Sequence, residues 1–299
     1  MTAPTVLHRL EAALVGAGLA GLRALGPVAG AALAGALARR IGPVLPVSRV
    51  ADANLRLALP TLDAAARRRV VRGAWDNLGR TVGELANLDR LRQTASGPGW
   101  EIAGAAHLAA VRAPGASGIA VSAHVGNWEM LTPAAAQLGL RVGGFYRAAA
   151  NPLVDRLVNR LRQRACGAGV PLFAKGAEGA RGAFAHLRGG NLLGILADQK
   201  QNDGVAATLF GRPAMTSAAA AAFALRVRCP VLPIHCERVG PARLRIVVEP
   251  PLKLPDSGDR TADILALTEA INRKLEEWIS ARPESWLWLH RRWPKETYR

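Results

Sequence analysis

The segment Ala120–Met130, AVSAHVGNWEM, holds the residues whose types and spacing best suit catalysis. A short apolar run leads into His124, and Glu129 follows five positions later. On one regular helix, two side chains at that spacing point about 140° apart, so they can meet only across a loop. Gly126 permits a sharp turn, and Asn127 can cap a helix that begins directly after it.

An imidazole at a strand end beside a carboxylate suits general-base chemistry, because a positioned His can take the proton of an attacking alcohol. A carboxylate that binds the second ring nitrogen fixes the tautomer and stabilises the imidazolium. We therefore predict His124 as the base and Glu129 as its orienting partner. Backbone N–H groups at the start of the next helix are expected to stabilise the oxyanion. A structural contact at a turn is the alternative, since about 0.4 His-x4-acid pairs are expected by chance from 6 His and 22 acids in 299 residues.

The pattern around this segment predicts the elements that position it. A helical stretch covers 61–90, another helix begins at Pro152, and an amphipathic helix covers 259–279. Thr216 or Ser217 can cap an Ala-rich helix. Strand–helix alternation predicts an α/β fold with a mixed, largely parallel central sheet flanked by helices, and with the site at the carboxyl ends of the strands. Short apolar runs between turn residues predict the strands 118–122, 142–146, 170–173, 192–197, 231–235 and 244–248.

Residues 12–38 are almost wholly apolar and small, and Arg23 and Pro27 interrupt them. A clean membrane-spanning helix needs about 20 apolar residues in a row. We predict an interfacial or marginally spanning helical anchor, with Arg39 and Arg40 facing anionic head groups. A soluble Ala-rich hairpin and a cleaved secretory signal are the alternatives.

The formal net charge of +17 favours a polyanionic partner, such as nucleic acid, an anionic membrane face or an acidic carrier protein. A generally basic surface is the alternative. Only 5% of the residues are aromatic and no recognition motif occurs, so we predict no nucleic-acid partner. The three cysteines show no CxxC spacing, which predicts no metal site and suggests a reducing compartment. Gly16–Gly21 fits the GxGxxG pattern of dinucleotide sites, but the preceding strand and the later acidic residue are missing.

The segment HVGNWE resembles the H-x4-D/E signature of glycerolipid acyltransferases, and most resembles the bacterial lipid A acyltransferases of the lauroyl/myristoyl type. Further similar blocks follow in order over most of residues 50–295. Ala148 and Ala197 stand where that family usually has prolines, in loops predicted to face the substrate, which puts the identity of the acceptor in doubt. The similar blocks are FYR at 145–147, NPLVD at 151–155 with Arg162 and Arg164, LADQ at 196–199, LFGRPA at 209–214 with Thr216, and WLWLHRRW at 286–293.

The resemblance implies a fatty acyl donor on acyl carrier protein, a lipid A precursor as acceptor, and no metal or redox cofactor. It also implies work at the cytoplasmic face of the bacterial inner membrane. Residues 1–45 would form the membrane-associating segment and 46–299 the acyltransferase domain. His124 and Glu129 would be catalytic. The substrate-binding residues would be Asn127, Arg147, Arg164 and Asp198.

Arg147 could hold a phosphate of the acceptor or of the carrier's phosphopantetheine, and a surface salt bridge is the alternative. Asp198 ends an apolar strand and could bind the acceptor, organise the site or cap the next turn. One helical face carries Arg156, Arg160 and Arg164 and could dock an acidic carrier protein. The C-terminal tryptophans could anchor a membrane interface or simply pack. The alternative functions are acylation of another glycolipid, phospholipid or amino-acid lipid, and a non-catalytic basic membrane- or nucleic-acid-binding protein.

Overall fold

A computed structural model describes residues 4–146, 149–167 and 169–298. Its strands are β1 Gly99–Ala103, β2 Gly118–Ser122, β3 Val142–Tyr146, β4 Leu172–Ala174, β5 Leu192–Leu196, β6 Lys200–Leu209, β7 Arg212–Thr216, β8 Val231–Gly240 and β9 Arg243–Val248. Seven of them form one sheet in the order β1-β9-β8-β2-β5-β3-β4, in which only β8 and β9 pair antiparallel. The prediction of an α/β fold with a mostly parallel central sheet is confirmed.

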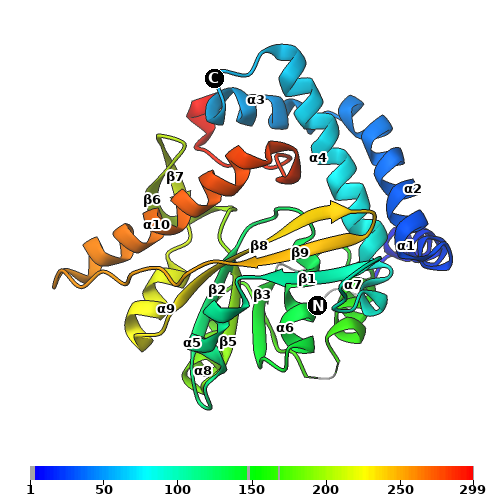
Figure 1. The fold of residues 1–299 in the computed structure, drawn as a ribbon. Helices are drawn as coiled ribbons and strands as arrows, with labels where there is room; N and C mark the ends of the chain where they lie inside the picture. The colour runs from blue at the N-terminus through cyan, green and yellow to red at the C-terminus, as the bar shows by residue number, and fades with distance from the viewer. Residues whose placement is uncertain (1–3, 147–148, 168, 299) are drawn as a thin grey trace.

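Helices cover both faces of this sheet (Figure 1). On one face, α6 and α7 pack against strand residues that include Val142, Leu192 and Ile234. On the other face, α8, α9 and α10 pack against Ile119 and Ile195 and their neighbours. The helices are α1 Val6–Ala24, α2 Gly26–Ile41, α3 Ser48–Ala58, α4 Ala64–Leu85, α5 Ala109–Arg112, α6 Leu131–Gln137, α7 Pro152–Cys166, α8 Ala177–Arg188, α9 Ala219–Val227 and α10 Arg260–Ala281.

The predicted helix starts are largely found. Asn151 caps α7 with Pro152 in its first turn, and Asp259 caps α10. The predicted cap of α9 is not found: its N-cap is Ala218, without a side-chain cap. Ser217 Oγ accepts only a 3.4 Å hydrogen bond from the Ala219 N–H, and Thr216 ends β7. The strands β1, β6 and β7 were not predicted. β6 begins with the polar residues KQND, so it lacks the apolar run by which the other strands were found.

The N-terminal helices form a hairpin whose second helix lies along α4 (Figure 1). Two glycines of α4 allow this close approach: a Cβ on Gly79 would lie 2.3 Å from the Ala34 carbonyl oxygen, and one on Gly83 would lie 2.6 Å from the Ala31 Cα. Arg23, at the end of α1, binds both carboxylate oxygens of Asp89 at 2.7 and 2.9 Å. The hairpin is therefore attached to the body by packing and by an ion pair.

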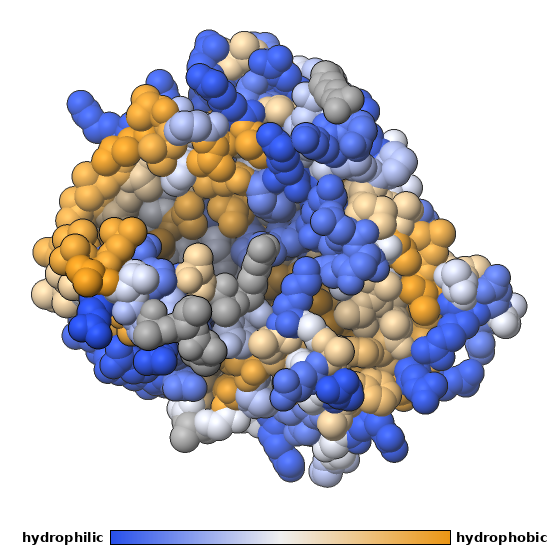
Figure 2. Space-filling model, turned by 180° about the vertical axis from the view of Figure 1, so that it is seen from behind, coloured by the Kyte–Doolittle hydropathy of each residue, from blue (hydrophilic) through white to orange (hydrophobic). Residues whose placement is uncertain are grey.

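The outer side of this hairpin is apolar, and Figure 2 shows that surface along the left edge of the view from behind. Among the described residues, no single helix is long and apolar enough to cross a membrane; Gly26–Val44 and Ser48–Ala58, bent by 84°, reach that length and composition only as a pair. The helical form of the predicted anchor is thus found, and its role as an anchor stays a prediction. Exposed apolar residues here include Val6, Leu7, Leu10, Leu14, Leu33, Leu37, Ile41 and Val44.

Candidate active site

His124 and Asp198 meet at one edge of the sheet because of the register between β2 and β5. Ser122 pairs with Leu196 in this parallel ladder, so His124 and Asp198 each lie two residues beyond a matched position. The His124 Nδ1 lies 2.8 Å from Asp198 Oδ1, and the His124 backbone N–H donates to Asp198 Oδ2 at 3.0 Å. The indole N–H of Trp286 donates to the same Oδ2 at 2.7 Å. The Asp198 carboxylate thereby fixes both the backbone and the ring of His124.

Burial and charge act in opposite directions on this pair. Burial alone would raise the pKa of the Asp198 carboxyl, but the charge of His124 and the hydrogen bonds from His124 and Trp286 hold that pKa well below its usual range. Burial alone would lower the pKa of His124, but Asp198, and more weakly Glu129, raises it above the ordinary value. The site therefore contains a buried carboxylate beside an imidazole that binds a proton readily.

Glu129 does not hold the His124 ring, contrary to the predicted pairing. Its carboxylate receives two hydrogen bonds from Arg162 of α7, Nε to Oε2 at 2.8 Å and Nη2 to Oε1 at 2.7 Å. Trp128 packs edge-on against the His124 ring, with centroids 5.0 Å apart. Glu129 was predicted as the partner of His124 because the two are close in sequence. Asp198 lies beside His124 only because of the register between β2 and β5.

Asn127 holds the loop after His124 in place, and its predicted role in binding substrate stays a prediction. Its side chain is buried: Nδ2 donates to Glu84 Oε2 at 2.8 Å, and Oδ1 accepts from the Glu129 N–H at 3.1 Å. Glu84 belongs to α4 and also pairs with Arg238 of β8. At Gly126, φ is +59° and a Cβ would lie 1.9 Å from the Cys236 carbonyl oxygen, so this turn requires glycine.

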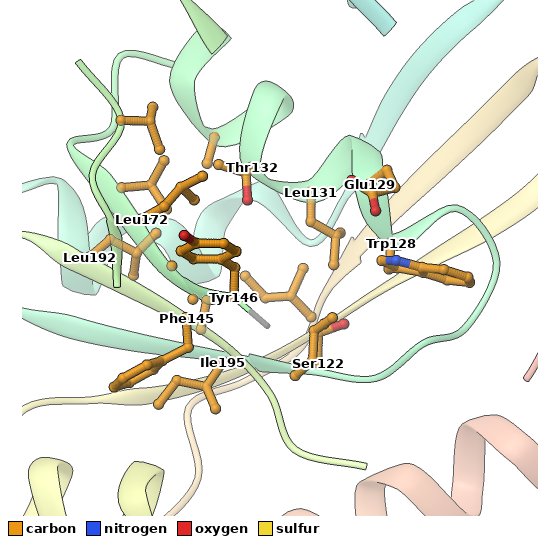
Figure 3. A pocket seen from close by; sticks show the side chains of 18 of the residues that line it. Ser122, Trp128, Glu129, Leu131, Thr132, Phe145, Tyr146, Leu172, Leu192 and Ile195 are labelled. Atoms are coloured by element: carbon orange, nitrogen blue, oxygen red, sulfur yellow. The ribbon is translucent and has the colours of Figure 1, made fainter. Parts of the chain in front are cut away.

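An apolar cavity of about 930 Å³ opens beside His124 and runs over the sheet under α6 (Figure 3). Ala120, Gly194 and Gly144 lie side by side on β2, β5 and β3 and form part of its floor. A Cβ on either glycine would meet no atom closer than 3.6 Å, so these small residues leave the space open. Its walls also carry Leu131, Ala135, Leu138, Leu140, Val142, Leu172, Leu192, Ile234 and Ile246.

The family model described as bacterial lipid A biosynthesis acyltransferase matches residues 2–295, essentially the whole chain. The protein belongs to this family. It is therefore an acyltransferase with an acyl donor and a lipid acceptor, which argues against the non-catalytic alternative. No curated protein sequence matches this chain.

Two arginines of this acyltransferase, Arg147 and Arg164, were predicted to bind substrate. Arg147 falls outside the described residues. Arg164 is exposed on α7 and does not line the cavity, whereas Arg162 does. Two positions along a helix turn a side chain by about 200°, which is why these two neighbours face opposite ways. Arg162 was noted in the sequence only as part of a similar block.

The C-terminal tryptophans of the acyltransferase are buried, so the packing interpretation is correct. The Leu287 N–H donates to the His124 carbonyl at 3.1 Å, next to the bond from Trp286 to Asp198. Arg292 is fully buried: its Nη1 donates to the Met215 carbonyl at 3.1 Å and its Nη2 to Thr216 Oγ1 at 2.6 Å. Burial lowers the pKa of Arg292 to about 10. No pattern in the sequence indicates that this segment reaches His124.

Four of the amides that follow His124 are bound within the protein, and the Trp128 N–H at the start of the next helix is not among them, so the expected backbone oxyanion hole stays a prediction. The Val125 N–H donates to the Ala123 carbonyl at 2.8 Å, and the Gly126 N–H donates to the Ser285 carbonyl at 3.0 Å. The Glu129 and Met130 N–H groups both bind Asn127. In the part of the chain that the structure describes, no group of three His, Cys, Asp or Glu side chains could hold a metal ion.

Proposed function

We propose that this acyltransferase moves a fatty acyl chain from the thioester of acyl carrier protein to a hydroxyl of a lipid A precursor. The observation that carries the proposal is the His124–Asp198 pair at the opening of a large apolar cavity in a chain of this family. An apolar cavity with a few convergent polar groups suits a long acyl chain that ends at the reacting centre.

In the proposed reaction, His124 is the general base and Asp198 its orienting residue. Asp198 keeps the ring proton on Nδ1, so Nε2 can accept the proton of the acceptor hydroxyl. The hydroxyl oxygen attacks the thioester carbonyl and forms a tetrahedral intermediate. When the C–S bond breaks, the imidazolium returns the proton to the leaving thiolate, and the ester remains. Glu129 holds Arg162 at the cavity wall and adds negative charge near the ring.

Charge and exposure support the proposed partners. The exposed face of α7 carries Arg156, Arg160 and Arg164, which suits the acidic acyl carrier protein. We keep Arg147, which follows β3, as the candidate for a donor or acceptor phosphate. The exposed apolar hairpin, followed by Arg39 and Arg40, suits the anionic cytoplasmic face of the inner membrane. Another glycolipid remains the second candidate acceptor.

The test of this proposal is acyl transfer by the purified chain in detergent, from radiolabelled lauroyl or myristoyl acyl carrier protein to a lipid A precursor. We expect labelled lipid and released carrier thiol in equal amounts. An intact thioester after incubation with the precursor would contradict the proposed acceptor or donor. The same donor offered with phospholipids, other glycolipids and amino-acid lipids would then identify the acceptor.

Replacing Gly194 with Leu should shift the products toward shorter acyl chains. A side chain at this position would project into the cavity floor, where a Cβ meets only the Gly143 carbonyl oxygen at 3.6 Å. We expect transfer from long-chain donors to fall while transfer from shorter ones persists, as measured by mass spectrometry with a mixture of acyl donors. Retention of the shorter donors is the control for folding, and an unchanged chain-length profile would place the acyl chain elsewhere.

The pH dependence of kcat/KM should show an acidic limb set by His124. A base must be neutral to accept a proton, and Asp198 raises the pKa of His124 above its ordinary value of about 6.5. The rate should therefore still be rising with pH near neutrality and level off only above that raised pKa. A rate that is already constant below pH 6 would show that no such imidazole limits the reaction.

A further inference from the structure

The side chain of Ser122 is buried, and its hydroxyl contributes no hydrogen bond to the fold that the structure describes. Its side chain is 4% exposed, and its Oγ has no hydrogen-bond partner among the described residues. Buried polar groups are nearly always hydrogen-bonded, so one that is not calls for an explanation. Ser122 lines the cavity, and Figure 3 shows it on the cavity wall between Ile195 and Trp128.

The position of Ser122 along β2 places it between the base and the acyl-chain floor. Alternate residues of a strand share a face, so Ala120 and Ser122 both point to the cavity. His124 lies two residues further on and lines the same cavity. Consider an acyl chain that lies over Ala120 with its carbonyl carbon within reach of His124. The carbon atoms at the carbonyl end of that chain must then lie beside Ser122.

Acyl transfer needs a hydrogen-bond donor at this point, because negative charge develops on the carbonyl oxygen during attack. The backbone amides of Val125, Gly126, Glu129 and Met130 are already bound within the protein. The His124 amide binds Asp198. A hydroxyl that faces the cavity and makes no hydrogen bond to any described residue can supply such a donor, alone or together with the Trp128 N–H at the start of the next helix.

We propose that the Ser122 hydroxyl donates a hydrogen bond to the carbonyl oxygen of the acyl thioester and stabilises the oxyanion of the tetrahedral intermediate. This inference rests on the proposed acyl transfer. When the acceptor oxygen bonds to the carbonyl carbon, the C=O electron pair moves to the oxygen that Ser122 binds. The pair returns as the C–S bond breaks, and Ser122 keeps its proton throughout.

The first test compares the steady-state kinetics of Ser122→Ala and Ser117→Ala with wild type. Loss of one oxyanion donor should lower kcat by about 10²- to 10³-fold, with a much smaller change in KM for the acyl donor. The melting temperature of Ser122→Ala should not fall, because no hydrogen bond within the protein is lost. Ser117 is the matched control on the same segment: its hydroxyl donates to the Leu187 carbonyl at 2.5 Å, so Ser117→Ala should lower the melting temperature and keep kcat.

The second test measures hydrogen bonding to the acyl carbonyl group in the absence of turnover. Lauroyl acyl carrier protein with an isotope label at the acyl carbonyl is bound to the His124→Ala variant, and its carbonyl NMR signal is recorded. A hydrogen bond to the oxygen should move that signal downfield from its position in the free donor. The added substitution Ser122→Ala should return it toward the free position. This arm needs no acceptor, so it distinguishes failure of this inference from a wrong acceptor in the proposed function.

Three results would overturn the role of Ser122. One is a kcat of Ser122→Ala within about threefold of wild type, well short of the loss expected for an oxyanion donor. Another is a carbonyl signal that is unaffected by either the protein or the added substitution. The last is a loss confined to donors that carry a hydroxyl on the acyl chain, because Ser122 would then recognise the chain and not the carbonyl.

Discussion

Replacing His124 with Ala should lower acyl transfer by about 10²- to 10⁴-fold, the contribution of a general base. Without the imidazole, the acceptor hydroxyl must attack while it still carries its proton. Single-turnover transfer from labelled acyl carrier protein would measure the loss. The effect should appear in kcat, because the cavity that holds the acyl chain is unchanged.

A folding control is needed because His124 also satisfies Asp198. Its removal leaves the buried carboxylate with fewer donors, which should cost some stability. His124→Gln is the matched variant, since its amide can still donate to the carboxylate but cannot act as a base. A folded His124→Gln protein with near wild-type transfer would rule out His124 as the base.

Replacing Asp198 with Asn should lower kcat by roughly 10³- to 10⁴-fold, as expected when the carboxylate of a His–Asp pair becomes an amide. The amide no longer favours the ring tautomer with its proton on Nδ1, nor does it stabilise the imidazolium. Loss of the negative charge should also lower the pKa of His124 and move the acidic limb of the pH profile to lower pH. Stopped-time assays across the pH range would show both effects.

The Glu129→Gln variant is the matched control, because it neutralises the other carboxylate near the ring. Glu129 binds Arg162 and contributes less than Asp198 to the raised pKa of His124. We expect a smaller loss of kcat and a smaller movement of the pH limb than in Asp198→Asn. If Glu129→Gln instead shows the larger loss of kcat and the larger movement of the pH limb, Glu129 orients the His124 ring during catalysis and Asp198 does not.

Local pattern was enough to predict much of this fold. The bounds of β2 and β3 were predicted to the residue, because each is an apolar run between turn residues. The starts of α7 and α10 were also predicted to within one residue, and the structure shows that Asn151 and Asp259 cap them. His124 could be found for the same reason: it directly follows a buried strand.

The contacts of His124 could not be predicted in the same way. Asp198 was recognised as the end of a strand, but only the register of β2 and β5 decides that it meets His124. The register depends on packing across the whole sheet, which no local pattern records. The Glu84–Asn127 contact likewise joins α4 to the loop after His124 over 43 positions of sequence. Ser122 is an ordinary strand residue by sequence, and what distinguishes it is that its buried hydroxyl has no hydrogen-bond partner among the residues that the structure describes.

Because Trp286 lies close to the C-terminus, its contact with Asp198 can form only late in the synthesis of the protein. A ribosome adds about 5–20 residues per second, so His124 leaves it on the order of ten seconds before Trp286 is added. During that interval the hairpin that we propose to bind the membrane has already been made, while the segment that donates to Asp198 does not yet exist. The proposed anchor is thus made before the proposed catalytic centre is complete, and loss of the final segment by proteolysis would remove contacts to both His124 and Asp198.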